Sequence, residues 1–528
     1  MNDATTRRRW NALGWAFLLG SAAGLRLLGI HETDIWTDEA FTLLVARSSW
    51  FDVLVRFPQV ETNPPLHFAL VKAWGVVSDA AVWHRLLSVI VGVSGVVFTT
   101  LWARRLDPSI GWAAGFLAAS CPIFCHYSQE IRGYSLLYSA TVSALYFAEL
   151  DASGSRRGRW WPVAAAATVW THYVGVFAVV AVVVYWLARR WVLGRVSPIR
   201  WRRLGVLALL LSPGLFLVVP RVATTVAEGF PIRTPTWAGL PSLSRPLLGT
   251  AWVATWRGDP ASELMEWAAV VVRGMLELSL GLAAGLPFFA GPRRIRRDAA
   301  ATWLTAGVIL ASMIAMGLWV VPVLVPRTGA IALPPLMIAL ALGTSRSAAS
   351  TCRRLAVAAC SIVTIVWAGL WISAATGDAP RRSPDAKLFR FVSERIEPGD
   401  DVICFPSSLA WSTAYYLGDQ LSAERLHYSN VSEFAEGSPL RIRPIGRNED
   451  PHWFERVTTR LEERMNDGSH SAVWVLDCGL RSFGTPLRQE LLDWIHPRYR
   501  AVGSHFVPGL WTFSATRFVP VDPVGGRP

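Results

Sequence analysis

Long apolar stretches separated by short polar segments dominate the first 375 residues. The apolar runs begin with "WNALGWAFLLGSAAGLRLLGI" and continue over residues 82–102, 110–126, 132–150, 161–171, 173–188, 204–220, 264–290, 301–325, 329–343 and 355–375. The longer runs match the roughly 20 apolar residues that a helix needs to cross a bilayer. The pattern predicts a polytopic α-helical membrane protein with about 11 transmembrane helices. That number requires 161–171 and 173–188 to be two short crossings, which makes this region the least determined part of the topology.

Residues from about 376 onward show a different pattern. After the polar linker "GDAPRRSPDAK", strand-like runs such as "DDVICFP" and "SAVWVLDCG" alternate with amphipathic segments such as "HWFERVTTRLEERMN". This alternation is typical of an α/β domain. We therefore expect a membrane domain at residues 1–375 and a soluble α/β domain at residues 376–528. The sequence contains no P-loop and no GxGxxG motif after a strand, so it does not indicate a nucleotide site.

The composition agrees with a membrane protein. Hydrophobic residues make up 52% of the chain and charged residues only 17%, whereas soluble proteins carry about 25% charged residues. The 27 tryptophans often stand at the ends of apolar runs, as in the aromatic belts of membrane interfaces. The net charge of +13 does not indicate nucleic-acid binding, because the arginines cluster in short loops between the apolar runs.

The loops between the apolar runs predict the orientation of the chain. The N-terminus and the loops "WARRLD", "SGSRRGRW", "ARRWVLGRVSPIRWRRL", "GPRRIRRD" and "SRSAASTCRR" are basic and alternate with loops that are not. The positive-inside rule places the basic set in the cytoplasm. The first loop (residues 31–80), the turn "CHYSQEIRGY", the segment from about 221 to 262, the residues around "VPVLVPRTGA" and the tail would then face outward. We expect a multi-pass protein of the cell membrane with an extracytoplasmic α/β domain.

Polar residues that could do chemistry concentrate on the outward-facing segments. The first loop carries Asp34, Asp38 and Glu39 in "DIWTDEAFT", where the chain leaves the first apolar run. Other outward segments supply further polar side chains, namely Asn63, His67, His126, Glu130, Arg132, Tyr134, His172 and Arg327. Carboxylates and arginines beside apolar helices suit chemistry on a lipid-carried substrate, although a solvated loop or a helix cap explains isolated acids equally well.

Metal binding is not indicated by the sequence. His126 and Glu130 are four residues apart and would share a helix face, but no third ligand accompanies them, so we expect a packed, hydrogen-bonded pair. The six cysteines show no CxxC spacing. No cofactor is indicated, and the sequence leaves a divalent cation open.

Six segments together resemble one family. They are "LRLLGIHETDIWTDEAFT", "NPPLHFALVKAW", "WHRLLSVIVG", "HYSQEIRGYSLL", "THYVGVF" and "VPRTGAIALPPL". Their order and spacing resemble those of the dolichyl-phosphate-mannose–protein mannosyltransferase-like family of GT-C integral-membrane glycosyltransferases, over about the first 345 residues. The resemblance implies inverting transfer of a hexosyl or pentosyl group from a polyprenyl-phosphate-linked donor. The acceptor would be a hydroxyl of a glycan, lipid or protein outside the cytoplasm.

The resemblance also implies roles for single residues. Asp38 would be the catalytic base, while Glu39 would orient the loop or bind the acceptor. The donor phosphate and sugar would be bound by Arg132, Arg327, Asn63, Tyr134, His172 and Glu130. These residue types suit the reaction, because a carboxylate can activate a hydroxyl and arginine binds phosphate in a bidentate way.

Two positions depart from the family pattern. Asn63 stands before Pro-Pro where relatives often have Lys or His, and the acid Glu130 precedes Arg132, whereas relatives often carry an acid one turn beyond the arginine. The contacts of relatives with the sugar ring therefore do not transfer to this chain.

Two other classes of function are consistent with the topology. A flippase or transporter for a lipid-linked sugar would need polar groups near the bilayer midplane, and a non-catalytic scaffold would act only through its α/β domain. An Asp38→Asn variant separates the classes, because only a transferase should lose turnover while still binding its donor.

Overall fold

The computed structural model forms two compact units. One, here called the helical unit, comprises residues 1–31, 62–67 and 77–379, and the other, the α/β unit, comprises residues 32–61, 68–76 and 380–528. Most of the first loop (residues 31–80) thus groups with the tail, although the sequence pattern assigned it to the membrane domain. The structure describes residues 3–32, 34–60, 63–192, 201–228, 277–281, 285–287, 291–319, 326–376, 384–405, 409–428, 434–435, 441–442, 452–468, 472–477, 485–507 and 513–521.

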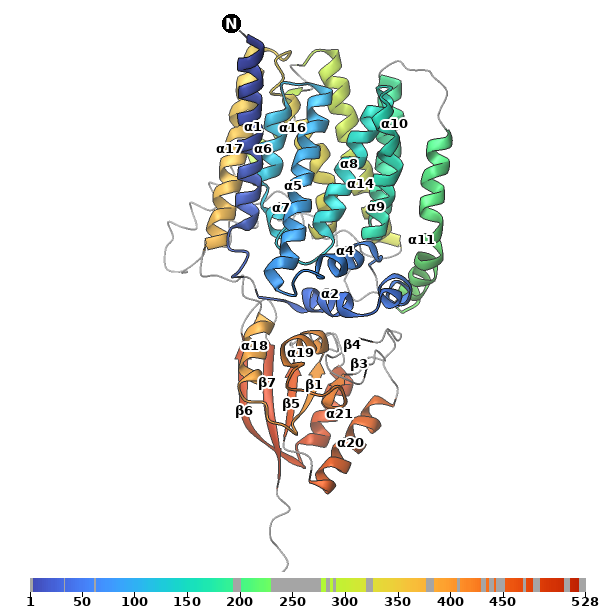
Figure 1. Ribbon diagram of the computed structural model, residues 1–528, viewed down its shortest axis with the longest axis vertical. Helices are drawn as coiled ribbons and strands as arrows, with labels where there is room; N and C mark the ends of the chain where they lie inside the picture. Colours follow the sequence, from blue (N-terminus) through green and yellow to red (C-terminus); the bar gives the residue numbers. More distant parts are fainter. Residues whose placement is uncertain are drawn as a thin grey trace, which may run out of the picture. The chain divides into compact units, whose positions relative to one another are not determined.

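The helical unit is a bundle of apolar helices (Figure 1). Its helices are α1 (Asp3–Leu27), α5 (Ala81–Leu106), α6 (Gly111–Ser120), α7 (Pro122–Tyr127), α8 (Tyr134–Ala152), η2 (Arg156–Trp160), α9 (Trp161–Thr171), α10 (Gly175–Val192), α11 (Trp201–Glu228), α14 (Arg293–Trp319), α15 (Pro326–Gly329), η5 (Ala330–Ala332), α16 (Leu333–Leu342) and α17 (Ser350–Thr376). Helix α4 (Leu66–Trp74) begins in this unit and continues into the α/β unit.

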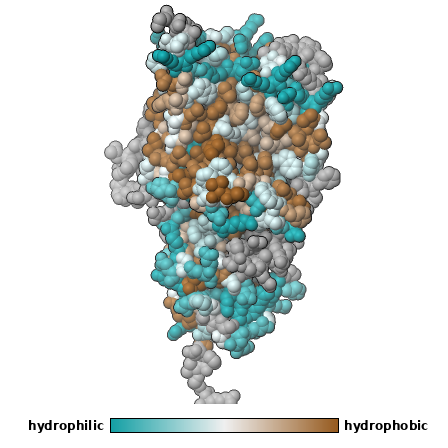
Figure 2. Space-filling model, in the orientation of Figure 1, coloured by the Kyte–Doolittle hydropathy of each residue, from teal (hydrophilic) through white to brown (hydrophobic). Residues whose placement is uncertain are grey.

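Several helices of this unit are long and apolar enough to cross a membrane. Among the described residues, four helical segments meet both criteria by length and composition, namely Ala81–Leu106, Gly175–Val192, Arg293–Gly317 and Ser350–Thr376. Apolar side chains cover much of the visible face of the bundle, and hydrophilic side chains gather at the end that carries the N-terminus of α1 (Figure 2). The chain is therefore a helical membrane protein. The number of crossings stays a prediction, since the expected span at 264–290 lies largely outside the described residues.

Helix breaks divide the apolar runs at 110–126 and 161–188. The run at 110–126 divides into α6 and α7 at Cys121 and Pro122, because Pro122 cannot donate a backbone hydrogen bond to the preceding turn. The run at 161–188 divides into α9 and α10, as the sequence pattern predicts. His172, Tyr173 and Val174 lie in this second break.

A buried ionic cluster joins three helices of the bundle. The guanidinium of Arg189 on α10 donates to both carboxylate oxygens of Glu149 on α8, over 2.6 and 2.9 Å. It also donates to Asp298 on α14. All three side chains are almost fully buried, so removing one partner would leave an uncompensated charge in the bundle. The cluster therefore fixes the packing of these three helices.

The α/β unit contains a mixed sheet. Its strands are β1 (Asp401–Phe405), β2 (Leu426–Tyr428), β5 (Val473–Asp477), β6 (Tyr499–Val507) and β7 (Phe513–Pro520), in the order β2-β1-β5-β7-β6. Strand β1 pairs in parallel with β2 and β5, while β7 pairs antiparallel with β5 and β6. The remaining elements of this part are α18 (Pro384–Ser393), α19 (Leu409–Leu417), η6 (Ala423–Arg425), α20 (Trp453–Asp467), α21 (Thr485–Ile495) and the short pair β3 (Phe434–Ala435) and β4 (Arg441–Ile442).

Alternating side chains give the sheet two apolar faces. Val402 and Cys404 of β1 belong to a core shared with α18 and α19, while Ile403 and Phe405 belong to a core shared with α20 and α21. This period of two is what a strand buried on both sides requires.

The first loop (residues 31–80) completes one of these cores. It folds into α2 (Thr37–Arg47), η1 (Asp52–Arg56), α3 (Phe57–Val60) and the second part of α4. Phe41, Leu44 and Val45 of α2 lie in the same core as Leu409 and Ala410 of α19. The loop that carries the acids is thus an integral layer of the α/β unit.

Candidate functional site

Side-chain hydrogen bonds anchor the turn between α7 and α8 to the end of α1. Gln129 donates through Nε2 to the carbonyls of Arg26 and Leu28, each over 2.8 Å. Nε of Arg26 donates to the Ser128 hydroxyl over 3.1 Å, and the Arg26 side chain is fully buried. The end of α1 therefore holds the turn that presents Arg132.

Arg132 lies among histidines from two other parts of the chain. It is buried, and its charge acts on both His67, at the start of α4, and His172, in the break between α9 and α10. The next residue, Gly133, allows this close approach: a Cβ there would stand 3.0 Å from Thr171 Cγ2 and 3.4 Å from His67 Cβ. The turn, α4 and the end of α9 thus meet around Arg132.

Both histidines are held neutral. Burial, and then the positive charge of Arg132, lower the pKa of His67 to about 3, against a smaller opposing effect of a hydrogen bond with the Ile131 backbone. The pKa of His172 also falls to about 3, because of burial and the charges of Arg132 and Arg327. A neutral imidazole can both donate and accept a hydrogen bond. Two cations and two neutral imidazoles therefore share one region of the helical unit.

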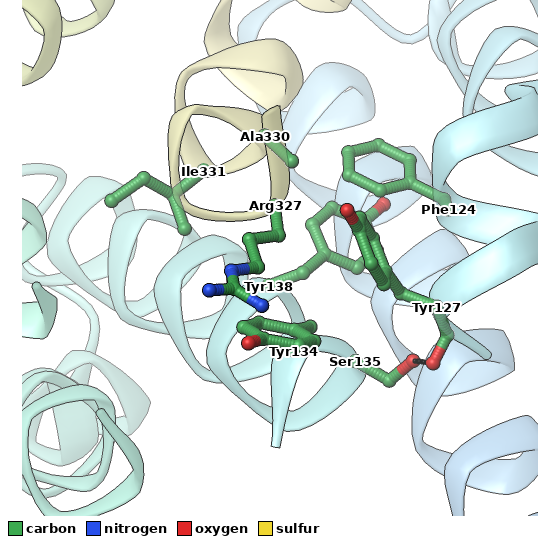
Figure 3. A pocket seen from close by; sticks show the side chains of 8 residues that line it. All are labelled: Phe124, Tyr127, Tyr134, Ser135, Tyr138, Arg327, Ala330 and Ile331. Carbon is green, nitrogen blue, oxygen red and sulfur yellow. Dashed lines mark hydrogen bonds between the residues drawn. The ribbon is translucent and has the colours of Figure 1, made fainter. Parts of the chain in front are cut away.

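An aromatic pocket surrounds Arg327 (Figure 3). It is a small cavity of about 10 Å³, lined by Phe124, Tyr127, Tyr134, Ser135, Tyr138, Arg327, Ala330 and Ile331. The guanidinium carbon of Arg327 lies 5.9 Å from the centre of the Tyr134 ring, and the Tyr134 and His172 rings are 6.0 Å apart. A cation over an aromatic face is favourable and stays oriented, so Arg327 is placed to receive an anion at the edge of this pocket.

Glu130 supplies an acceptor beside the same turn. His126 Nε2 and Glu130 Oε1 are 3.1 Å apart, which is the hydrogen-bonded pair that their spacing predicts. Glu130 Oε2 is buried and has no hydrogen-bond partner among the described residues. No group of three or more metal-ligating side chains occurs in the part of the chain that the structure describes.

The acids of "DIWTDEAFT" belong to the α/β unit. Asp38 and Glu39 stand in the first turn of α2, where the helix dipole favours negative charge. Asp38 is partly exposed, while Glu39 is buried. Asp34 precedes the helix and pairs with Arg390 over 2.5 Å.

The expected site residues therefore fall into two groups. Arg132, Tyr134, His172 and Arg327 lie together in the helical unit, and Glu130 stands in the turn that carries Arg132. Asn63 also belongs to this unit, just before α4. Asp38 and Glu39 belong to the other unit. The catalytic and binding roles of all these residues remain predictions.

Arg26 and Gln129, which anchor the turn, are not among the site residues predicted from the sequence. Arg26 carries a recognisable signal, because an arginine inside an apolar helix must find partners there and marks a structural or functional position. Gln129 gives no such signal, since an amide in a turn is ordinary.

Comparisons with known proteins give similarity to solved structures only, since no family model and no curated protein matches the chain. ArnT from Cupriavidus metallidurans is 14% identical in the apo state, over 96% of this chain and 98% of that one, with a TM-score of 0.48. The same protein bound to undecaprenyl phosphate gives 14% identity, coverages of 98% and 100%, and a TM-score of 0.44. An oligosaccharyltransferase from Archaeoglobus fulgidus gives 13% identity, coverages of 94% and 72%, and a TM-score of 0.48. Both are GT-C glycosyltransferases, the superfamily that the sequence resembles. At such identities and TM-scores, the similarity establishes neither the family nor the activity of this chain.

Proposed function

We propose that the protein transfers a sugar, with inversion, from a polyprenyl-phosphate-linked donor to an acceptor hydroxyl on the extracytoplasmic face of the membrane. The observation that carries this proposal is the meeting of Arg327, Arg132 and His172 beside an aromatic pocket in a bundle of apolar helices. Arginines within apolar bundles are rare and commonly mark the path of a charged substrate, and an anion is the ligand that Arg132 and Arg327 would bind. A lipid phosphate combines that anion with an apolar chain.

The donor side of the reaction would use the helical unit. As the bond between sugar and phosphate breaks, negative charge develops on the phosphate oxygens, and Arg132 and Arg327 would stabilise it. His172, being neutral, would donate one further hydrogen bond. The buried Oε2 of Glu130 would accept a hydrogen bond from a sugar hydroxyl. Phosphate is a good leaving group, so this arrangement needs no strong general acid.

The acceptor side would use α2. Asp38, which is partly exposed in the first turn of α2, would take the proton of the acceptor hydroxyl as that oxygen attacks the anomeric carbon. A positioned base contributes about 10²–10⁴ to the rate. Glu39 would orient the loop or the acceptor. These residues account for binding of the phosphate and activation of the hydroxyl. They do not specify which sugar is transferred or which acceptor receives it.

A donor screen tests the proposal. Purified protein in lipid nanodiscs would be incubated with several polyprenyl-phosphate sugars, and transfer to added acceptors would be measured by mass spectrometry. We expect Asp38→Asn to lower kcat about 10²–10⁴-fold while donor binding stays unchanged. Arg327→Gln should instead weaken donor binding, because it removes one of the two phosphate cations.

Two results would contradict the proposal. One is transport of a lipid-linked glycan across the bilayer without transfer of sugar from any donor, which would favour the flippase. The other is full transfer activity in Asp38→Asn, which would exclude this carboxylate as the base.

A further inference from the structure

The tail of the α/β unit surrounds the acidic N-terminal turn of α2. Three contacts occur at nearly consecutive positions: Arg390 of α18 pairs with Asp34 over 2.5 Å, the Tyr416 hydroxyl donates to the Ile35 carbonyl over 2.7 Å, and the hydroxyls of Ser412 and Thr37 are 3.0 Å apart. The next residue in the chain is Asp38.

The two contacts from α19 come from one face of that helix. Ser412 and Tyr416 are four residues apart and therefore project from the same side. On α2, Thr37 and Phe41 have the same spacing, and the Phe41 ring lies 5.2 Å from the ring of Trp411. Thr37 and Phe41 thus both face α19, which fixes the rotation of α2 about its axis.

The far end of α2 is fixed by a different residue. Lys72 of α4 donates through Nζ to the carbonyls of Ala46 and Ser48, over 3.1 and 2.6 Å. These carbonyls lie at the C-terminal end of the helix, where a cation is favourable. Because both ends are held within the α/β unit, α2 cannot turn or slide independently of the tail.

These contacts contribute little to the folding stability of the protein. Arg390 is half exposed, and an ion pair of this kind adds only about 0–1 kcal/mol to stability. Trp36, the residue before α2, makes no side-chain cap, and the hydrogen bonds from α19 are made to Ile35 and Thr37 on either side of it. Their common effect is on the position of that turn.

We propose that Arg390, Ser412 and Tyr416 are positioning residues that orient the Asp38 carboxylate through the N-terminal turn of α2. The inference rests on the proposed function, in which Asp38 is the base. It gives the tail a role in the chemistry. Residues of α18 and α19 would hold α2 in its catalytic position, and the tail would not act as a separate binding module. A misplacement of about 1 Å can cost about 10²-fold in rate, so small changes at this contact should be measurable.

The test compares variants of this contact in the full-length protein. Tyr416→Phe and Arg390→Gln each remove one contact and should lower kcat about 10- to 100-fold, with donor affinity and thermal unfolding unchanged. Arg390→Lys keeps the charge and should recover part of kcat. Hydrogen exchange of the α2 amides should become faster in the first two variants, which is a measurement independent of activity.

Matched controls come from the same unit. Tyr499→Phe removes a hydroxyl that lies 3.0 Å from Met465 Sδ in the core on the other face of the sheet. Arg395→Gln removes an exposed pair with Glu394. Both controls should keep the wild-type kcat and the wild-type exchange of α2.

The outcomes separate this inference from the proposed function. Wild-type kcat and unchanged α2 exchange in Tyr416→Phe and Arg390→Gln would overturn the inference, even where Asp38→Asn is inactive. A parallel fall of thermal stability, donor binding and kcat would also overturn it, as that pattern marks a purely structural role. If the wild type transferred no sugar, the proposed function would fail, while faster exchange of α2 in the variants would still support the docking itself.

Discussion

At the scale of single residues, His67 and His172 should make the stability of the helical unit depend on pH. Their pKa values in the folded protein are about 3, against an ordinary value of 6.5. Between these values the unfolded chain binds protons that the folded chain does not. Stability is therefore complete above about pH 6.5 and should fall as the pH drops from there toward 3.

Thermal unfolding followed by tryptophan fluorescence at pH 7, 6, 5 and 4 measures this dependence. Replacing His67 by Gln removes one of the two groups, so the decline of the unfolding temperature between pH 6.5 and 4 should be shallower than in the wild type. His452→Gln, at an exposed position, should leave the decline unchanged. Identical declines in His67→Gln and the wild type would show that His67 is not buried as a neutral group.

At the scale of elements, the break between α6 and α7 explains why an arginine is buried in α1. Pro122 has no N–H to give to the Ala118 carbonyl, four residues earlier in α6. Arg26 takes its place by donating to the carbonyls of Ala118 and Ala119, over 3.3 and 3.0 Å. The side chain thus satisfies helix-terminal acceptors that no water could reach.

An Arg26→Met variant should therefore lower the unfolding temperature, since each buried acceptor left without a donor costs about 1–3 kcal/mol. Arg105→Gln, which removes an exposed arginine at the end of α5, serves as the control. Equal unfolding temperatures of the Arg26→Met and wild-type proteins would contradict this explanation of the break.

The same element shows how far the sequence could predict the structure. Apolar runs predicted the helices around α6, α9 and α10, and the alternation of patterns predicted strands such as β1, because these signals are local. The docking of α2 on α19 has no local signal: Thr37 and Ser412 are 375 residues apart, and either helix face would suit many partners. For the same reason, the aromatic pocket around Arg327 depends on packing that periodicity does not describe.

At the scale of the whole molecule, the basic helix ends gather at one end of the helical unit. Arg104 at the end of α5 donates to Asn11 of α1 over 2.9 Å. Arg294 at the start of α14 donates to the Leu106 carbonyl over 3.3 Å. Loops that alternate along the sequence are thus neighbours in space, which is the arrangement that the positive-inside rule requires of a cytoplasmic face.

This arrangement makes the orientation of the chain testable with single cysteines. Ala349→Cys introduces a thiol at an exposed position in the basic loop before α17, and Asn466→Cys introduces one at an exposed position in α20. If the basic end is cytoplasmic, a membrane-impermeant maleimide should label Asn466→Cys in intact cells, while Ala349→Cys should react only after the membrane is opened. Labelling is measured as the increase over the parent protein, because Cys352 lies in the same region of the chain. The reverse pattern would place α2 and its acids on the cytoplasmic side, where an acceptor outside the cell could not reach Asp38.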